Sequence, residues 1–415
     1  MNSIIPQIKK VYDSAISVSR TSDSQKHNLL LHLADLLIAN TDEIMAENQK
    51  DLNRMEDTNP KKDRLLLTRE RILNLAEGLK AVANLPDPTG IVLSERVLDN
   101  GLSVQKMTAP MGVVGVIYES RPNVTIDVAA LCLRSGNAVI LRGGSDAEAS
   151  NQILVKLIHQ AMQEFGIHTD ALLLMPTDRK FVGELLTADQ YVDILIPRGS
   201  QALIDFVRTN ATVPTIETGA GVCHTYVTQS ADLEKARDIV INAKTSRPSV
   251  CNALDTILVD REVAARFLPM ILKGMQEFDV EIFADETAYE IIDAKSYPYL
   301  QLANESDFGR EFLSFKCSVK VVENYSEAVT HIRTYSSRHS EAIISEDSEL
   351  CETFLTEIDA AAVFANASTR FTDGGVFGLG AEIGISTQKL HARGPFALEK
   401  LVTEKWVVRG NGQIR

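Results

Sequence analysis

Several features that would point to a particular class of protein are missing from this 415-residue sequence. No stretch approaches the ~18 consecutive apolar residues of a membrane-spanning helix, and residues 1–10 lack the apolar core and cleavage site of a signal peptide. Positive charge is in deficit, because the net charge is −14, and this argues against nucleic acid or an anionic membrane as the main partner. We therefore expect a cytoplasmic protein with no nucleic-acid or membrane partner.

Cysteine is also scarce. Its five copies stand singly in the chain, at Cys132, Cys223, Cys251, Cys317 and Cys351. There is no CxxC pair and the total is odd, so neither a disulfide framework nor a zinc site is indicated. The cysteine pattern fits a reducing compartment, and we expect no bound metal ion.

What is present is the composition of an ordinary globular protein. Hydrophobic residues make up 45% of the chain and charged residues 24%, which are typical values for soluble domains. The length exceeds the usual size of a single hydrophobic core, so we expect two or three domains.

The order of the apolar segments predicts an α/β fold. From residue 110 onward, short apolar runs alternate with segments of helical length and spacing. The runs are residues 111–118, 138–141, 172–175, 192–196, 256–259 and 319–322. This alternation is typical of parallel sheets with crossover helices, and it occurs in both halves of the chain.

Two other segments predict a small antiparallel element. Residues 92–97 and 102–107 flank a turn at Asp99-Asn100-Gly101, which is the pattern of a β-hairpin. The C-terminal run 401–408 is typical of a strand that pairs only as an edge. The hairpin and this run form either a flap for dimerisation or an edge within one chain.

Two loops of the first sheet resemble phosphate-binding turns. Parallel sheets hold ligands at the carboxyl ends of their strands. There, Arg142, Gly143, Gly144 and Ser145 follow a strand and open a helix, so that backbone N–H groups and the helix dipole lie beside glycines that admit a ligand. Ser200 has the same position before the next helix. Either loop alone also fits an ordinary strand-to-helix turn, but two of them in one sheet indicate a nucleotide.

A third loop of this kind, residues 118–123, carries Arg121 and Asn123, an arginine and an amide, after the first strand of the sheet. Polar side chains at this edge of a parallel sheet are candidates for binding or catalysis.

The loop around Cys251 is the strongest candidate for chemistry. Residues 246–252 join a helical segment to a buried strand, and Pro248 disfavours helical geometry at Arg247, so the helix is expected to end before the thiol. Arg247 and Lys244 are nearby in sequence, and positive charge lowers the pKa of a thiol. Cys251 is therefore either a nucleophile or a small buried hydrophobic residue.

Six sequence blocks resemble the aldehyde dehydrogenase superfamily and, within it, the enzymes that reduce L-glutamyl 5-phosphate. The blocks are residues 118–125 (YESRPNVT), 141–145 (LRGGS), 221–227 (GVCHTYV), 247–252 (RPSVCN), 368–374 (STRFTDG) and 378–386 (GLGAEIGIS). They occur in order, and the resemblance covers almost the whole chain.

The resemblance implies a catalytic pair. Cys251 is expected to be the nucleophile that forms a thioester with an acyl phosphate. The side-chain amide of Asn123 and the backbone N–H of Cys251 are expected to form the oxyanion hole for the tetrahedral intermediate.

The resemblance also implies a nicotinamide cofactor held by the first sheet. Arg142 and Ser145 stand where relatives that use NAD commonly have a lysine and a glutamate for the adenosine ribose. Serine removes the repulsion against a 2′-phosphate and arginine supplies charge for it, so NADP(H) is preferred. Gly143 and Gly144 lie in the same turn. Ser200 is expected at the pyrophosphate, and Glu311 at the nicotinamide ribose.

Three arginines are candidates for the anionic substrate. The side chains of Arg121, Arg247 and Arg370 could bind its carboxylate or phosphate, because guanidinium groups bind such oxyanions bidentately; Arg121 and Arg370 could equally be structural. Glu217 is similar to the general base of hydrolytic aldehyde dehydrogenases. A base is a hazard to an enzyme that must exclude water, and the role of Glu217 stays open.

The function implied is NADPH-dependent reduction of L-glutamyl 5-phosphate to L-glutamate 5-semialdehyde and phosphate, the second step of proline biosynthesis from glutamate. The alternatives are a hydrolytic NAD(P)-dependent semialdehyde dehydrogenase and a non-catalytic nucleotide-binding protein. Expected partners are the substrate, phosphate, a second copy of the chain in a dimer, and glutamate kinase.

The domain division follows from the same resemblance. Residues 1–95 and 109–228, with part of 361–385, form the cofactor-binding domain, and residues 229–360 form the thiol domain. Residues 96–108 and 386–415 form the oligomerisation flap.

Overall fold

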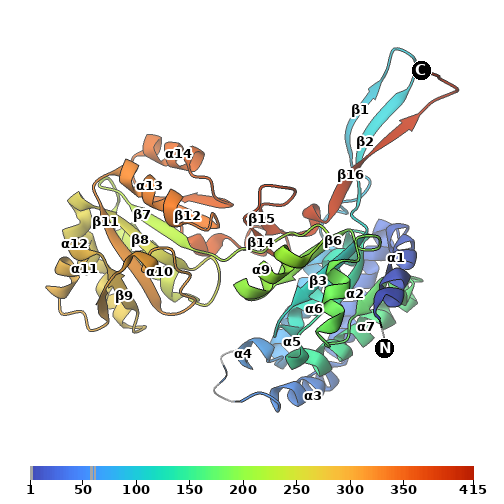
Figure 1. Cartoon of the computed structure of the whole chain (residues 1–415), viewed down its shortest axis with the longest axis horizontal. Helices are drawn as coiled ribbons and strands as arrows, with labels where there is room; N and C mark the ends of the chain where they lie inside the picture. Colours follow the sequence, from blue (N-terminus) through green and yellow to red (C-terminus); the bar gives the residue numbers. More distant parts are fainter. Residues whose placement is uncertain (1–2, 57–58, 60–61) are drawn as a thin grey trace. The chain divides into compact units, whose positions relative to one another are not determined.

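The computed structural model describes residues 3–56, 59 and 62–415, and the chain divides into two compact units (Figure 1). Unit 1 comprises Met1–Thr218, Gly378–Gly384 and Leu390–Arg415, and unit 2 comprises Gly219–Phe377 and Ile385–Lys389. The division expected from the sequence lay after residue 228. The strand Cys223–Val227 lies in unit 2 because it pairs with two strands of that unit's sheet.

Unit 1 is built on a parallel four-stranded sheet with the strand order β5-β4-β3-β6. Its strands are β3 (Val113–Tyr118), β4 (Ala138–Arg142), β5 (Leu172–Leu174) and β6 (Ile194–Arg198). Every residue of β3 is buried, as expected for a strand that is covered on both faces. Tyr118 pairs with Arg198, so β3 and β6 end side by side and deliver their loops to the same edge.

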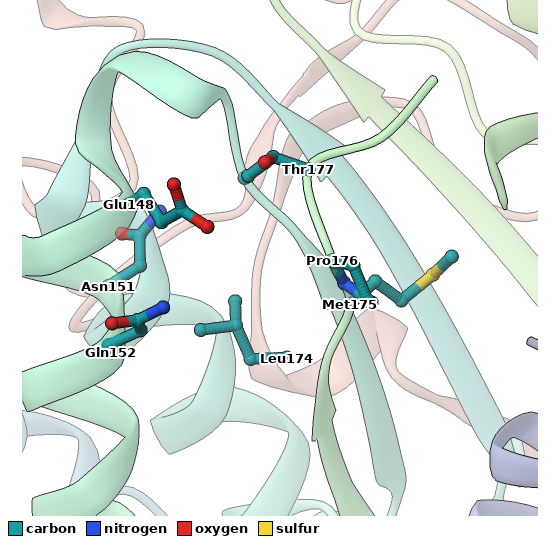
Figure 2. Close-up of a pocket in the computed structure, with 8 residues that line it drawn as sticks. Glu148, Asn151, Gln152, Leu174, Met175, Pro176 and Thr177 are labelled. Carbon is teal, nitrogen blue, oxygen red and sulfur yellow. The ribbon is translucent and has the colours of Figure 1, made fainter. Parts of the chain in front are cut away.

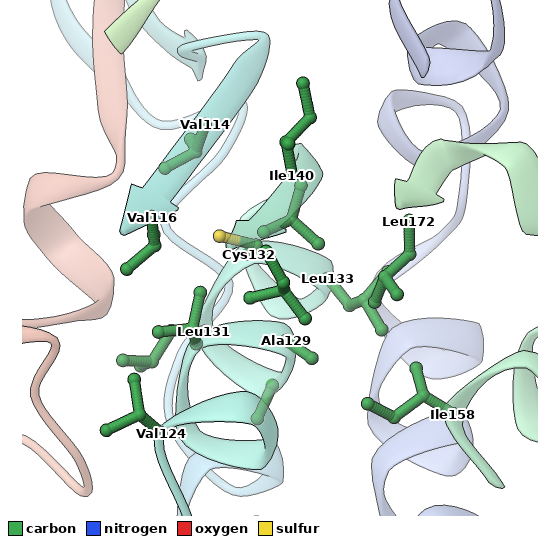
Figure 3. Packing of buried hydrophobic residues seen from close by; sticks show 14 of the residues in the cluster. Val114, Val116, Val124, Ala129, Leu131, Cys132, Leu133, Ile140, Ile158 and Leu172 are labelled. Carbon is green, nitrogen blue, oxygen red and sulfur yellow. The ribbon is translucent and has the colours of Figure 1, made fainter. Parts of the chain in front are cut away.

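The helices of unit 1 cover this sheet. They are α1 (Ile5–Ser19), α2 (Asp23–Ala39), α3 (Thr41–Leu52), α4 (Lys62–Leu65), α5 (Arg69–Ala83), α6 (Pro122–Arg134), α7 (Glu148–Glu164), α8 (Lys180–Leu186) and α9 (Gln201–Asn210). Figure 3 shows Val124, Leu131 and Cys132 of α6 packed towards Val116 of β3 and Ile140 of β4. Helix α6 is therefore held by apolar contacts along its length, which fixes its N-terminal turn at the edge of the sheet.

A three-stranded antiparallel flap also belongs to unit 1. The predicted hairpin is confirmed as β1 (Val92–Val97) and β2 (Ser103–Pro110), and β16 (Val402–Arg409) pairs with the other side of β2. Both outer strands expose apolar side chains, including Val97 (71% exposed) and Trp406 (58% exposed). The C-terminal run therefore pairs within its own chain and leaves β1 and β16 as edge strands.

Unit 2 contains a seven-stranded sheet with the order β10-β9-β11-β8-β7-β12-β13, and the neighbouring strands run parallel. Its strands are β7 (Cys223–Val227), β8 (Leu254–Asp260), β9 (Glu281–Ala284), β10 (Leu300–Leu302), β11 (Lys316–Val322), β12 (Ser340–Ile344) and β13 (Ala362–Ala365). Its helices are α10 (Leu233–Thr245), α11 (Arg261–Gln276), α12 (Glu286–Asp293), α13 (Tyr325–Tyr335) and α14 (Ser348–Glu357).

Short elements complete the chain. They are the strands β14 (Gly384–Ser386) and β15 (Gly394–Phe396) and the 3₁₀ turns Ser145–Ala147, Thr169–Ala171, Glu305–Asp307, Thr369–Phe371 and Leu398–Lys400. The predicted fold class, two parallel-sheet domains with a small antiparallel element, is confirmed. In the part of the chain that the structure describes, every helix is too short or too polar to span a bilayer.

Candidate active site

Cys251 lies in the loop between α10 and β8, as the sequence predicts. Asp232 is the N-cap of helix α10, and its carboxylate accepts hydrogen bonds from the N–H groups of Glu234 and Lys235; the helix ends at Thr245. Of the five cysteines, Cys251 alone is partly exposed. Burial raises the pKa of the thiols of Cys132, Cys223 and Cys317, so these stay protonated at neutral pH.

The backbone of Cys251 packs against the segment that precedes β7. A β-carbon placed on Gly221 would overlap the carbonyl oxygen of Cys251 and lie 2.9 Å from its Cα. The Cys223 thiol donates a hydrogen bond to the same carbonyl, with an S···O distance of 3.3 Å. The N–H of Gly221 in turn donates to the Glu311 carboxylate over 2.8 Å. Glu311 is therefore a neighbour of the thiol loop.

Asn252 ties the thiol loop to the glycine-rich segment near the end of unit 2. Its buried side-chain amide donates to the carbonyls of Thr372 (2.8 Å) and Arg370 (3.2 Å). The Thr369 hydroxyl donates to the Asn252 carbonyl over 2.8 Å. The Arg370 guanidinium donates to the Asn252 side-chain oxygen and, over 3.1 Å, to the hydroxyl of Ser246. These five contacts hold the loop in one conformation.

Arg370 contacts Ser246 and Asn252 of the thiol loop, and the same loop carries Arg247 and Cys251. Burial lowers the pKa of Arg370, and the charge of Arg247 lowers it further, whereas Asp373 and the Cys251 thiol raise it. Each of these groups is therefore close enough to act on the Arg370 guanidinium. The structure brings Arg247, Arg370 and Cys251 into one neighbourhood, with a surplus of positive charge that favours an anionic ligand.

In unit 1, the glycine turn after β4 packs tightly against its surroundings. A β-carbon on Gly143 would overlap the side-chain amide of Asn151 and lie 3.2 Å from the ring of Tyr118. A β-carbon on Gly144 would overlap the carboxylate of Asp146. A side chain at either position would therefore have to displace the side chain of Asn151 or Asp146.

A cavity of about 260 Å³ lies beside this turn. Its lining residues are Gly143, Glu148, Asn151, Gln152, Leu174, Met175, Pro176 and Thr177. Figure 2 shows Glu148, Asn151 and Gln152 of α7 on one side and residues 174–177 on the other. The cavity thus lies between two neighbouring strand ends, where ligands of parallel sheets bind.

Arg142 binds two of the residues that line the cavity. Its guanidinium donates to the carbonyls of Gly143 (3.0 Å) and Thr177 (2.8 Å). Burial lowers the pKa of Arg142, and the charge of Arg179 lowers it further. Two guanidinium groups close together are suited to a phosphate. The residues present therefore fit the adenosine end of a phosphorylated dinucleotide.

Ser145 and Ser200 occupy the helix starts expected of them. Ser145 is the first residue of the 3₁₀ turn before α7, and its side chain is exposed. Ser200 is the N-cap of α9, and its N–H donates to the carboxylate of Glu119 over 3.3 Å. Both side chains are available to a ligand at this edge of the sheet.

Asn123 lies in a helix rather than in the loop that the sequence indicates. Helix α6 begins at Pro122, with Arg121 as its N-cap, because proline fits the first helical position. Asn123 is therefore in the first turn, and its amide donates to the Asp127 carboxylate over 3.1 Å. The helix gives the amide a more rigid base than a loop would.

Glu217 lies in unit 1, and its carboxylate is 4.0 Å from the guanidinium of Arg208 on α9. The carboxylate of this candidate base therefore faces a guanidinium group of its own unit.

Sequence reasoning missed three residues of these surroundings. Asn151 and Thr177 line the cavity, and Asp127 binds Asn123. Thr177 follows the end of β5 and could have been found by treating that loop like the other strand ends. The i, i+4 spacing of Asn123 and Asp127 was a signal only once the helix was known to begin at Pro122. Among residues 3–56, 59 and 62–415, no cluster of three or more His, Cys, Asp or Glu side chains could hold a metal ion.

Comparison with known proteins places these features in a family. Residues 7–295 match the model of the aldehyde dehydrogenase family. The gamma-glutamyl phosphate reductase of Pelodictyon phaeoclathratiforme is 52% identical over 414 residues, which cover 99% of both chains. The enzyme of the same name from Legionella pneumophila strain Paris is 51% identical over 418 residues and 100% of both chains.

Solved structures give the same result. The crystal structure of gamma-glutamyl phosphate reductase from Thermotoga maritima matches with a TM-score of 0.94 and 41% identity, covering 100% of both chains. The NADP complex of glyceraldehyde-3-phosphate dehydrogenase from Methanocaldococcus jannaschii matches with a TM-score of 0.74 over 98% of this chain and 94% of its own, at 16% identity. This last likeness concerns the fold alone.

Proposed function

Because this chain belongs to the aldehyde dehydrogenase family, and within it to the gamma-glutamyl phosphate reductases, we propose that it reduces L-glutamyl 5-phosphate to L-glutamate 5-semialdehyde and phosphate. NADPH is the proposed reductant, and Cys251 the nucleophile. The reaction is the second step of proline biosynthesis from glutamate.

The proposed sequence of steps begins at Cys251. Its thiolate attacks the acyl carbon of L-glutamyl 5-phosphate, the carbon–oxygen bond to phosphate breaks, and a thioester on Cys251 remains. NADPH, when bound, supplies the hydride that reduces the thioester. The carbon–sulfur bond then breaks, and Cys251 leaves as a thiolate with release of the semialdehyde. Neither collapse of the tetrahedral intermediate requires a proton on its oxygen, so the chain needs donors that stabilise the negative charge on that oxygen rather than a strong base.

The observation that carries the proposal is the pair of arginines beside the thiol. The Arg370 guanidinium contacts Ser246 and Asn252, the sequence neighbours of Arg247 and Cys251, and guanidinium groups bind phosphate bidentately. We propose that Arg247 and Arg370 bind the phosphoryl group as it leaves. Arg121, at the N-cap of α6, is the proposed partner of the substrate carboxylate. An enzyme that hydrolyses its thioester has no use for such a phosphate site.

The proposed oxyanion hole combines the amide of Asn123 with the N–H of Cys251. It is supported by the anchoring of both groups. Asn123 is in the first turn of a buried helix, and the backbone of Cys251 is packed on Gly221. Hydrogen-bond donors that are already fixed in position before the reaction need not reorganise when negative charge develops on the carbonyl oxygen.

The proposed cofactor site uses the glycine turn of unit 1. Arg142 and Ser145 favour NADP(H) over NAD(H). Arg142 supplies positive charge for the 2′-phosphate, and Ser145 carries no negative charge that would repel it. Ser200 is the proposed contact of the pyrophosphate, and Glu311 that of the nicotinamide ribose. The cavity beside Gly143 supports an adenosine site there.

We also propose that the protein acts in the cytoplasm as a homodimer and receives its unstable substrate from glutamate kinase. The exposed edge strands β1 and β16, with Val97 and Trp406, are the surface suited to pairing with a second copy. Sedimentation of the full chain and of a Trp406→Glu variant tests the dimer, which is expected to dissociate in the variant.

The test of the proposed function is run in the reverse direction. NADP⁺ reduction is measured with L-glutamate 5-semialdehyde, with and without phosphate, for the wild type and for Cys251→Ala. We expect the rate to require phosphate and the Cys251→Ala variant to be inactive. Cys351→Ala, which changes a buried thiol on α14, is the control and should retain activity.

Two results would contradict the proposal. If phosphate makes no difference while NADP⁺ is reduced, the protein is a hydrolytic semialdehyde dehydrogenase. If Cys251→Ala keeps its rate, the thioester does not form on this residue.

A further inference from the structure

Asn123 and Asp127 lie one turn apart on the same face of α6. Side chains at i and i+4 of a helix are neighbours, and here the Asn123 amide nitrogen donates to the Asp127 carboxylate over 3.1 Å. The contact exists because α6 begins at Pro122, which brings Asn123 into the first helical turn. The amide is therefore bound to a fixed partner within its own helix.

Asp127 has a defined electrostatic setting. Burial raises the pKa of its carboxyl group to about 6, and the hydrogen bond from Asn123 and the charge of Arg198 act in the opposite direction. Arg198 comes from the end of β6, beside the end of β3, and its Nε is buried without a hydrogen-bond partner. Of the described residues, Arg198 is the charged group whose field reaches this carboxyl.

The carboxylate distinguishes the two ends of the amide. A carboxamide has an NH₂ end that donates and a carbonyl end that accepts, and the two have nearly the same shape. Only the NH₂ end can stabilise a negative oxygen. An ionised carboxylate accepts hydrogen bonds and cannot donate them, so it binds the NH₂ end. The nitrogen uses one hydrogen for Asp127 and keeps the second for another acceptor.

We propose that Asp127 is a positioning residue that keeps the NH₂ end of the Asn123 carboxamide available to the reacting carbonyl oxygen. This inference rests on the proposed role of Asn123 in the oxyanion hole. Asp127 does not touch the substrate in this role; it acts through Asn123.

The role makes activity depend on the ionisation of Asp127. Once protonated, the carboxyl group can donate to the carbonyl end of Asn123, and the amide loses its preferred orientation. The turnover rate is therefore expected to fall as the pH decreases through about 6. An Asp127→Asn variant keeps the shape, loses the charge and should show no such inflection.

The test is a double-mutant cycle with Asn123→Ala, Asp127→Asn and the double variant. The rate of NADP⁺ reduction is measured with L-glutamate 5-semialdehyde and phosphate, from pH 5 to 9. We expect Asn123→Ala to lose about 10²–10³-fold and Asp127→Asn to lose roughly tenfold, the effect of one charge-assisted hydrogen bond. The double variant should be no slower than Asn123→Ala, because Asp127 has nothing left to orient.

Controls separate positioning from folding. The rate of Cys251 alkylation by iodoacetamide and the binding of NADP⁺ should be unchanged by Asp127→Asn. Asp42→Asn makes the same charge change on an exposed part of unit 1 and should keep the wild-type rate and inflection. If Asp127→Asn does not fold, Asp127→Ser is measured in its place.

Two outcomes overturn the inference. One is a double variant whose loss equals the product of the two single losses, which indicates independent effects. The other is an Asp127→Asn variant with the wild-type rate and pH profile. Failure of the proposed function would be seen separately, as NADP⁺ reduction by the wild type that does not need phosphate. The double-mutant cycle would still test the role of Asp127 in that case, because hydrolysis of a thioester also passes through an oxyanion.

Discussion

Gly221 packs so closely on the backbone of Cys251 that a β-carbon at position 221 would lie 2.9 Å from the Cys251 Cα and overlap its carbonyl oxygen. The N–H of Gly221 is held at the same time by the Glu311 carboxylate. The main chain that carries the thiol is thus supported by a residue with no side chain, from a different part of the sequence. The position of a reactive side chain on a loop is only as well defined as the packing of the residues that support the loop.

Replacing Gly221 by alanine should displace the thiol loop. Overpacking of this kind typically costs about 1–3 kcal/mol of folding stability, and the rate of NADP⁺ reduction should fall more than the stability suggests. Thermal unfolding and steady-state kinetics measure the two effects. Gly78→Ala is the matched control, because no atom would contact the added methyl group within 4 Å and α5 should be stabilised by about 0.5–1 kcal/mol. A Gly221→Ala variant with wild-type kinetics would show that the loop yields without consequence.

Replacing Arg370 by lysine keeps the charge but removes the planar fork that reaches Asn252 and Ser246. We expect the KM for phosphate in the reverse reaction to rise roughly tenfold or more, because a lysine cannot bind phosphate bidentately. Arg333→Lys, which alters a surface pair with Glu357, should leave this KM unchanged. An unaltered KM for phosphate in Arg370→Lys would assign Arg370 to the support of the loop alone.

The cofactor preference should depend on Arg142 and Ser145. We expect Arg142→Ala to weaken NADPH binding by roughly tenfold or more while NADH binding changes little, since only NADPH carries the 2′-phosphate that the guanidinium is proposed to bind. Ser145→Glu should shift the preference in the same direction by repulsion. Fluorescence titration of both cofactors gives the ratio. Equal losses for NADPH and NADH would mean that Arg142 contacts another part of the dinucleotide.

The buried histidines of unit 2 should make the protein sensitive to acid. Burial lowers the pKa of His331 to about 3 and that of His339 to about 4, whereas an unfolded histidine titrates near about 6.5. Between these values the unfolded chain binds protons that the folded chain does not. The contribution of these neutral histidines to the free energy of unfolding is therefore fully present above pH ~6.5. It is lost as the pH falls towards ~4, by up to about 1.4 kcal/mol per pH unit for each group.

His331→Phe tests this origin of the acid sensitivity. The His331 ring lies among the rings of Phe308, Tyr335 and His224, and its Nε2 has no hydrogen-bond partner, so phenylalanine loses no bond at that atom. The unfolding temperature of the variant should fall less steeply between pH 6.5 and 4 than that of the wild type. His168→Phe, at an exposed position, should leave the slope unchanged. An equal slope in His331→Phe would place the acid sensitivity elsewhere.

The local pattern of residues was sufficient to predict the type and approximate position of the strands and of the hairpin. The apolar runs became strands of two parallel sheets, and the turn Asp99-Asn100-Gly101 joins the expected hairpin. The same pattern was insufficient for boundaries that depend on neighbours. Residues 223–227 joined the sheet of unit 2 because β8 and β12 offered partners, and no periodicity within the segment distinguishes one sheet from another.

The sequence by itself determined where reactive groups could stand. Pro248 disfavours continuation of the preceding helix, which leaves Cys251 in a loop, and the glycine doublet marks the turn between β4 and α7. Only the tertiary structure decided what surrounds them. Gly221 beneath Cys251, Arg370 on Asn252 and Thr177 on Arg142 join segments far apart in the chain. Such contacts follow from how the sheets pair and pack, and local sequence carries no record of which distant backbone will lie within hydrogen-bonding distance.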